Sequence, residues 1–236
     1  VGASLNQSPI PQSARITIHN PVDLELMDQP ATTRDRVRDA CGLAHDDVAV
    51  GIFGRVIPWK GQLEFVRALL LAMDANSSLR ALIVGDESDG DEAYFRQVRD
   101  TIAASPVAER FILTGYRKNV EEYYAAMDIV VHASVTPEPF GRVIPEAMAA
   151  GRAVIAADAG GPRELIDHGI DGVLTPPGDI DALSGAVLTL ASNKTLRDSM
   201  AVAGKKKAAA RFGAVAQARQ VAAVYQEVLA SQRTVE

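Results

Sequence analysis

Between Val48 and Leu174 the chain alternates short, continuously apolar runs with longer segments whose apolar residues recur at helical spacing. The short runs predict buried strands at residues 48–53, 81–84, 111–113, 129–132, 154–156 and 172–174. The longer segments predict helices at residues 61–73, 94–102, 120–127, 144–150 and 162–166. Strands that alternate with helices form a parallel sheet covered on both faces. We therefore predict an α/β fold, a Rossmann-like doubly wound parallel sheet of about six strands.

The two ends of the chain depart from this alternation. After the last strand, helices are expected at residues 179–190, 196–211 and 214–230, which makes a helical C-terminus. Residues 1–20 carry Ser, Asn, Gln and Pro without a period, as expected of a linker or the remnant of an interdomain crossover. Residues 21–236 are then expected to form one domain. Because the chain starts at Val1 and not at Met, we expect it to be a fragment.

Charge and cysteine content exclude several classes of protein. The chain has 24 basic and 30 acidic residues, a net charge of −6, which speaks against a nucleic-acid partner. Its one cysteine, Cys41, excludes a disulfide framework and a zinc site built on several thiolates. No apolar run approaches the roughly 18 residues that span a bilayer, and no secretory leader is recognisable. We therefore expect a cytoplasmic protein.

The loop after the first predicted strand, GRVIPWKG at residues 54–61, has the composition of an anion site. Arg55 and Lys60 flank a turn that enters a helix, and cations beside a helix start hold phosphates. The segment matches neither the P-loop pattern nor the dinucleotide-binding pattern GxGxxG. The alternative is a pair of solvated cations on an ordinary loop.

The segment that follows the fourth predicted strand places two carboxylates at the edge of the sheet. Glu138 lies on the loop and Glu146 in the first turn of the next helix, with Gly141 between them. Carboxylates accept hydrogen bonds from the hydroxyls of a sugar or a ribose. The alternative for Glu146 is an acidic first turn favoured by the helix dipole.

The segment after the fifth predicted strand contains Gly160 and Gly161 directly before a helix. Consecutive glycines in this position form a backbone nest for a phosphate or a hydroxyl, and the alternative is a tight turn without a ligand. Doubly wound sheets bind ligands at the carboxyl ends of their strands. Three such loops at neighbouring strand ends therefore predict one ligand site.

The order of these motifs resembles that of a known family. GR-x4-KG, then EPFG-x4-EAMA-x-G, then GG-x2-E is similar to the C-terminal, donor-binding domain of retaining GT-B glycosyltransferases of family 4, from about residue 16 to the end. The resemblance implies one half of a GT-B fold and a hexosyltransferase that uses a nucleotide diphosphate sugar (NDP-sugar). It also implies retaining transfer that needs neither a metal nor another cofactor. The acceptor would bind to a separate N-terminal domain that these residues do not include.

The resemblance also implies roles for single residues. Glu138 would contact the transferred sugar and is the catalytic candidate, and Glu146 would contact the ribose. Arg55 and Lys60 would hold the diphosphate. The further donor-binding residues are expected to be Gly85, Tyr116, Arg117, Phe140, Gly141, Arg142, Gly160 and Gly161.

Two alternatives stay open, a nucleotide-sugar binding module without independent catalysis and a GT-B-like nucleotide-sugar epimerase. We expect the isolated domain to be inactive in transfer. The acidic string at residues 86–92 contains D-x-D, a metal-binding pattern in another glycosyltransferase architecture, and we expect a solvated loop there. Lysines at 205–207 predict a solvated face, with peripheral contact to anionic lipid at the inner face of the membrane as the minority interpretation.

Overall fold

Strand β1 (Val48–Phe53) lies inside a six-stranded parallel sheet with the order β3-β2-β1-β4-β5-β6. The other strands are β2 (Leu79–Val84), β3 (Phe111–Gly115), β4 (Ile129–His132), β5 (Ala153–Ala157) and β6 (Val173–Thr175). This computed structural model describes residues 15–86 and 91–233. Parallel pairing throughout, with helices between the strands, confirms the predicted Rossmann-like architecture.

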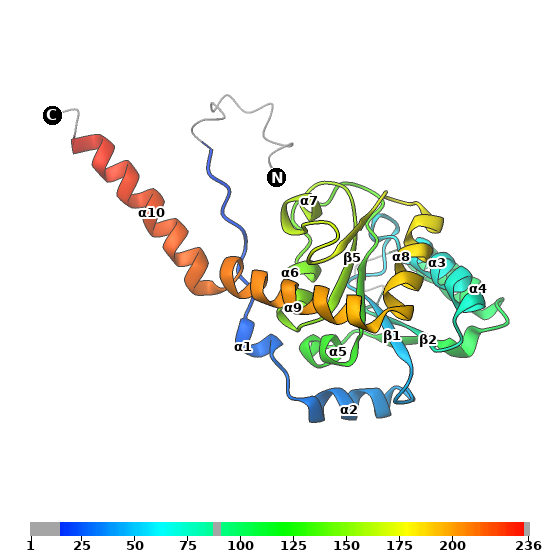
Figure 1. Ribbon diagram of the computed structural model, residues 1–236. Helices are drawn as coiled ribbons and strands as arrows, with labels where there is room; N and C mark the ends of the chain where they lie inside the picture. Colours follow the sequence, from blue (N-terminus) through cyan, green and yellow to red (C-terminus); the bar gives the residue numbers. More distant parts are fainter. Residues whose placement is uncertain (1–14, 87–90, 234–236) are drawn as a thin grey trace.

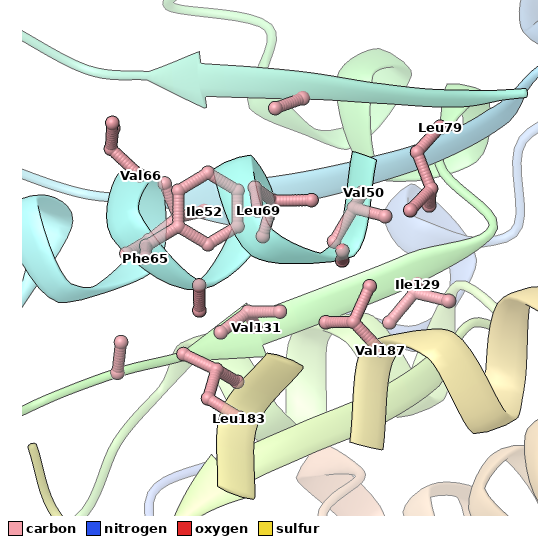
Figure 2. Packing of buried hydrophobic residues seen from close by; sticks show 14 of the residues in the cluster. Val50, Ile52, Phe65, Val66, Leu69, Leu79, Ile129, Val131, Leu183 and Val187 are labelled. Atoms are coloured by element: carbon pink, nitrogen blue, oxygen red, sulfur yellow. The ribbon is translucent and has the colours of Figure 1, made fainter. Parts of the chain in front are cut away.

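One face of the sheet is covered by α3 (Gln62–Ala75), α4 (Glu92–Ala103) and α8 (Ile180–Ser192). Successive side chains of a strand point to opposite faces, so Val50 and Ile52 of β1 both face this layer. Figure 2 shows them beside Phe65 of α3 and Leu183 of α8, and all four side chains are buried. This cluster forms the first of two hydrophobic cores.

The second core lies on the opposite face, where Ala49 and Phe53 of β1 point. The helices that cover it are α1 (Leu24–Met27), α2 (Ala31–Ala40), α5 (Val120–Ala126), α6 (Val143–Ala149), α7 (Pro162–Leu165) and α9 (Lys194–Arg211). The connecting helices change face where the chain returns from β3 to the middle of the sheet. The point between β1 and β4 is therefore the topological switch, where doubly wound sheets open a crevice for a ligand.

Helix α10 (Ala214–Arg233) projects away from the sheet (Figure 1). Apolar side chains stand exposed along it, among them Val215, Tyr225 and Leu229. Two 3₁₀ turns complete the described elements, η3 (Pro58–Lys60) and η4 (Ala108–Arg110). Within residues 15–86 and 91–233, no helix combines the length and apolar character needed to cross a bilayer.

The helices α1 and α2 were not predicted. Helix α2 has few apolar residues, and its attachment to the sheet is largely polar. Arg34 and Arg38 donate hydrogen bonds to the carbonyls of residues 125–127 and to the Asp128 carboxylate. Asp128 in turn accepts from the backbone N–H of Ala49 at 2.8 Å. These partners lie far from α2 in the chain, so no periodic pattern of apolar residues within α2 predicts the helix.

The remaining predicted elements are present, with some bounds shifted. Strand β2 begins at Leu79 and not at residue 81, and β6 covers Val173–Thr175 where residues 172–174 were predicted. Of the expected linker, residues 15–20 have no regular secondary structure, and residues 1–14 lie outside the described part of the chain. Most of the acidic string, residues 87–90, lies outside it as well.

Candidate functional site

The loops after β1 and β4 meet at the switch point. The ammonium of Lys60, at the end of η3, lies 2.9 Å from Oε1 and 3.0 Å from Oε2 of Glu138. Backbone contact joins the same loops, because Val135 N–H donates to the Trp59 carbonyl at 2.9 Å. The sequence placed Lys60 and Glu138 on separate motifs, and the fold brings them into direct contact across the switch.

Glu138 has further partners from the end of β4. Its Oε2 accepts from His132 Nε2 at 2.5 Å and from the Ser134 hydroxyl at 2.9 Å. Burial alone would raise the pKa of Glu138, but hydrogen bonds and charge from His132 and Lys60 outweigh burial and lower the pKa from 4.5 to about 2. Glu138 is therefore a carboxylate at neutral pH, and only 12% of its side chain is exposed. Such a group can accept a hydroxyl hydrogen but is a poor proton donor.

Glu146, in the first turn of α6, is held by a different set of residues. The Tyr124 hydroxyl donates to its Oε2 at 3.0 Å, and Arg142 lies 3.1 Å from its Oε1. Burial raises the pKa of Glu146, while Tyr124 and Arg142 act in the opposite direction. Burial also raises the pKa of Tyr124 well above its usual value, so its hydroxyl stays protonated and donates. Arg142 is two-thirds exposed and can swing toward a ligand.

The two glycines after β5 pack against the loop after β4. The N–H of Gly161 donates to the Glu138 carbonyl at 2.7 Å, and a Cβ on Gly161 would lie 2.5 Å from the Phe140 carbonyl oxygen. At Gly160, with φ of +69°, a Cβ would lie 2.4 Å from the Glu138 carbonyl oxygen. These glycines thus permit a close approach between loops. A phosphate nest would need the Gly161 N–H as a donor, but this N–H already donates to the Glu138 carbonyl.

A cavity of about 480 Å³ opens beside the loops after β1, β2 and β3. Four residues predicted to bind a donor lie on its wall, Arg55, Gly85, Tyr116 and Arg117. The Tyr116 side chain stands exposed there, and the Arg117 guanidinium lies 5.4 Å from the Tyr123 ring. A cavity of this size suits a small organic ligand. Phe140, Gly141 and Arg142 lie on the other side of the switch, on the segment that enters α6.

Three residues of this arrangement were missed by sequence reasoning, His132, Ser134 and Tyr124. His132 is the last residue of β4 and Ser134 follows two residues later, so their place at a strand's carboxyl end was an available signal. Nothing in the sequence marked Tyr124 as part of the site, because an aromatic residue on a predicted helix is ordinarily expected to belong to the hydrophobic core. Among residues 15–86 and 91–233, no group of three or more His, Cys, Asp and Glu side chains is arranged to hold a metal ion.

Comparison with known proteins connects this geometry to a family. Residues 47–193 match the family described as glycosyl transferases group 1. The chain is 27% identical over 223 residues to the lipopolysaccharide core biosynthesis mannosyltransferase LpsB of Rhizobium meliloti (strain 1021), covering 92% of this chain and 63% of that protein. The chain thus spans about three fifths of the length of this relative.

Solved structures agree with this match. HepE of Anabaena in complex with UDP-glucose superposes with a TM-score of 0.87 at 32% identity, over 95% of this chain and 61% of that one. A second structure is the C-terminal domain of a glycosyl transferase group 1 family protein (LpcC) from Francisella tularensis. It matches with a TM-score of 0.73 at 25% identity, over 82% of this chain and 99% of that one. The described fold therefore resembles the C-terminal domain of that protein over almost the whole length of the solved chain.

Proposed function

The chain belongs to the glycosyl transferases group 1 family, and from this premise we propose that it binds an NDP-sugar as the donor half of a retaining hexosyltransferase. The observation that carries the proposal is the contact of Lys60 with Glu138 at the β1–β4 switch. Arg55, on the same loop as Lys60, lines the cavity of about 480 Å³. A cation for phosphate and a carboxylate for hydroxyls meet there at the carboxyl ends of neighbouring strands. Both UDP and UDP-glucose are ligands of the similar Anabaena protein, which supports this class of ligand.

The proposed roles follow the geometry. Arg55 and Lys60 take the diphosphate, together with the backbone around Phe140, Gly141 and Arg142. Tyr116 and Arg117 lie along the base in the cavity, with Gly85 in its wall and Gly160 and Gly161 behind Glu138. Glu146 takes the ribose hydroxyls.

The departing nucleoside diphosphate carries negative charge, and fixed cations stabilise it in the transition state. The transferred sugar passes through an oxocarbenium-like state, in which an ionised carboxylate at Glu138 is favourable. With Arg55 and Lys60 in this role we propose that neither a metal nor another cofactor takes part. We propose that Glu138 and Glu146 act together as one motif, with Glu138 binding the sugar and Glu146 binding the ribose of the same donor.

The proposal extends to location and partners. We propose that the protein acts in the cytoplasm on cell-envelope polysaccharide, as the similarity to a lipopolysaccharide core biosynthesis mannosyltransferase suggests, with an acceptor bound to a separate N-terminal domain. A peripheral contact with anionic lipid at the inner face of the membrane would use the lysines at 205–207. Lys205 lies 2.6 Å from Asp28, and Lys207 lies 2.5 Å from Asp171, so this run offers less charge to anionic lipid than its sequence suggests.

The test is calorimetry of the chain with UDP, GDP and ADP and with their hexose conjugates. Substituting Arg55→Ala or Lys60→Met should weaken binding of the preferred nucleotide at least about tenfold, since each removes a charge-assisted contact. Lys194→Met is the matched control, because Lys194 pairs with Asp198 on the exposed start of α9. Absence of binding to all three nucleotides, or unchanged affinity in both variants, would contradict the proposal.

A transfer assay separates the alternatives. The 236-residue chain is expected to bind the donor without glycosylating an acceptor. Robust transfer by the chain alone would show that the acceptor site lies within it. Interconversion of a bound NDP-sugar with its epimer would instead favour the epimerase alternative.

A further inference from the structure

His132 ends β4 with its side chain only 3% exposed. Its Nε2 lies 2.5 Å from Glu138 Oε2 and 3.2 Å from the Ser134 hydroxyl oxygen. A carboxylate only accepts hydrogen bonds, so Nε2 must carry the hydrogen. The other ring nitrogen, Nδ1, is buried and has no hydrogen-bond partner within the described residues. Burying Nδ1 without a partner costs stability. The favourable polar interaction of the His132 ring is therefore its hydrogen bond from Nε2 to Glu138.

The two oxygens of Glu138 are not equivalent. Oε2 accepts from His132, from Ser134 and from Lys60. Oε1, among the contacts of the described residues, accepts from Lys60 alone. Oε2 therefore has two donors on the β4 segment besides Lys60, whereas Oε1 depends on the Lys60 ammonium.

Lys60 also has a competing partner under the proposed function. A donor diphosphate carries more charge than one carboxylate, and the same ammonium is proposed to bind it. Movement of Lys60 toward the phosphates would release Oε1, while Oε2 would keep its contacts with His132 and Ser134. His132 cannot follow, because its ring is enclosed at the end of β4.

We propose that His132 is a positioning residue, which holds Oε2 of Glu138 so that Oε1 is presented to a hydroxyl of the donor sugar. The inference rests on the proposed function, and it assigns a task to a histidine that does not itself touch the ligand. It also predicts an order of events, in which the diphosphate draws Lys60 away and thereby opens Glu138 to the sugar.

The test compares His132→Gln with His132→Asn. The Gln amide can place a donor where Nε2 lies, whereas the shorter Asn amide reaches only the position of Nδ1. The first measurement is the NMR titration of the Glu138 carboxyl carbon in the ligand-free chain. The second is the ratio of the Kd for the preferred nucleoside diphosphate, chosen from UDP, GDP and ADP, to the Kd for its hexose conjugate.

With His132→Gln we expect the ratio to be retained and Glu138 to titrate slightly closer to its usual range, because the hydrogen bond is kept and the charge of His132 is lost. With His132→Asn, which loses the hydrogen bond as well as the charge, we expect a larger shift of the Glu138 titration toward its usual range than with His132→Gln. The hexose conjugate should bind at least about fivefold more weakly, and the nucleoside diphosphate less than about twofold more weakly, because only the sugar contact is lost. His45→Asn is the control, since the His45 side chain is fully exposed.

Wild-type behaviour of His132→Asn in both measurements would overturn the inference. Equal weakening of both ligands would also overturn it, since that marks general damage to the site. Failure of the wild type to bind any of the three nucleotides would instead reject the proposed function. The titration distinguishes the two failures, because it needs no ligand.

Discussion

The hydroxyl of Tyr124 on α5 donates a hydrogen bond of 3.0 Å to Glu146 on α6, while its ring stacks on Phe53 of β1 at a centroid distance of 3.9 Å. One buried side chain thus joins a central strand to a carboxylate at the ligand edge of the sheet. A tyrosine serves here because the aromatic ring fills the core and the hydroxyl satisfies a half-buried acid.

Tyr124→Phe should separate these two tasks. The ring stacking is kept and one hydrogen bond to a charged group is lost, so we expect the free energy of unfolding to fall by about 1.5–3 kcal/mol. The pKa of Glu146, already raised by burial, should rise further, because the hydrogen bond that opposes burial is gone. Urea denaturation and carboxyl NMR measure the two effects. Tyr225→Phe on the exposed face of α10 should change neither.

Glu138→Gln should change how the free energy of unfolding depends on pH below 4.5. The pKa of Glu138 is lowered in the folded chain to about 2 from 4.5. The stability that ionised Glu138 contributes is therefore present above pH 4.5 and is lost as the pH falls from 4.5 to about 2. In that window one protonation step contributes a slope of at most about 1.4 kcal/mol per pH unit. Denaturation between pH 2 and 5 should show a shallower slope for Glu138→Gln, and Glu227→Gln on α10 should retain the wild-type slope.

Gly161→Ala tests the packing of the loops after β4 and β5. The backbone of Gly161, at φ of −55°, is one that alanine adopts readily, so any cost comes from the Cβ, which would lie 2.5 Å from the Phe140 carbonyl oxygen. We expect a loss of about 1–3 kcal/mol, as for overpacking, together with weaker nucleotide binding. Thermal unfolding and calorimetry measure both.

Gly185→Ala is the matched control for that substitution. A Cβ at Gly185, within α8, meets nothing within 4 Å. Alanine there should stabilise the helix by about 0.5–1 kcal/mol. If Gly161→Ala left both stability and nucleotide binding unchanged, the close approach of the loops after β4 and β5 would not constrain position 161.

Asp128→Asn should be among the most destabilising changes at the amino-terminal edge of β4. Arg34, Arg38 and the backbone N–H of Ala49 all donate to the Asp128 carboxylate. Removing the charge leaves two partly buried guanidinium groups without their acid, a loss of about 3–5 kcal/mol. Chemical denaturation measures it. Asp198→Asn removes an exposed i,i+4 partner of Lys194 and should cost less than about 1 kcal/mol.

The sheet was predictable because its signals are local. Strand β1 falls where VAVGIF stands, since a buried parallel strand needs a continuous apolar run with a clear end. Helix α2 escaped prediction because Arg34 and Arg38 hold it through groups about 90 residues away, which no period within ATTRDRVRDA reveals.

The candidate site divides in the same way. The positions of Arg55, Lys60 and Glu138 after the ends of β1 and β4 were predictable from the apolar runs that precede them, and their roles in ligand binding stay predictions. The contacts of Glu138 with Lys60 and His132 were not, because they depend on which loops the fold sets side by side. Tyr124 could not be told from an ordinary core aromatic until its distance to Glu146 was known.

The contact of Lys60 with Glu138 also has a consequence for the folding of the chain. The two residues are 78 positions apart, and their elements become neighbours only when β4 pairs with β1. In the sequence, β2 and β3 stand between β1 and β4, and pairings of large sequence separation form more slowly than local ones because a longer loop must close. A growing chain that has made β1, β2 and β3 already has half its sheet but no crevice. A chain still under synthesis therefore cannot form the Lys60–Glu138 contact before β4 has been made.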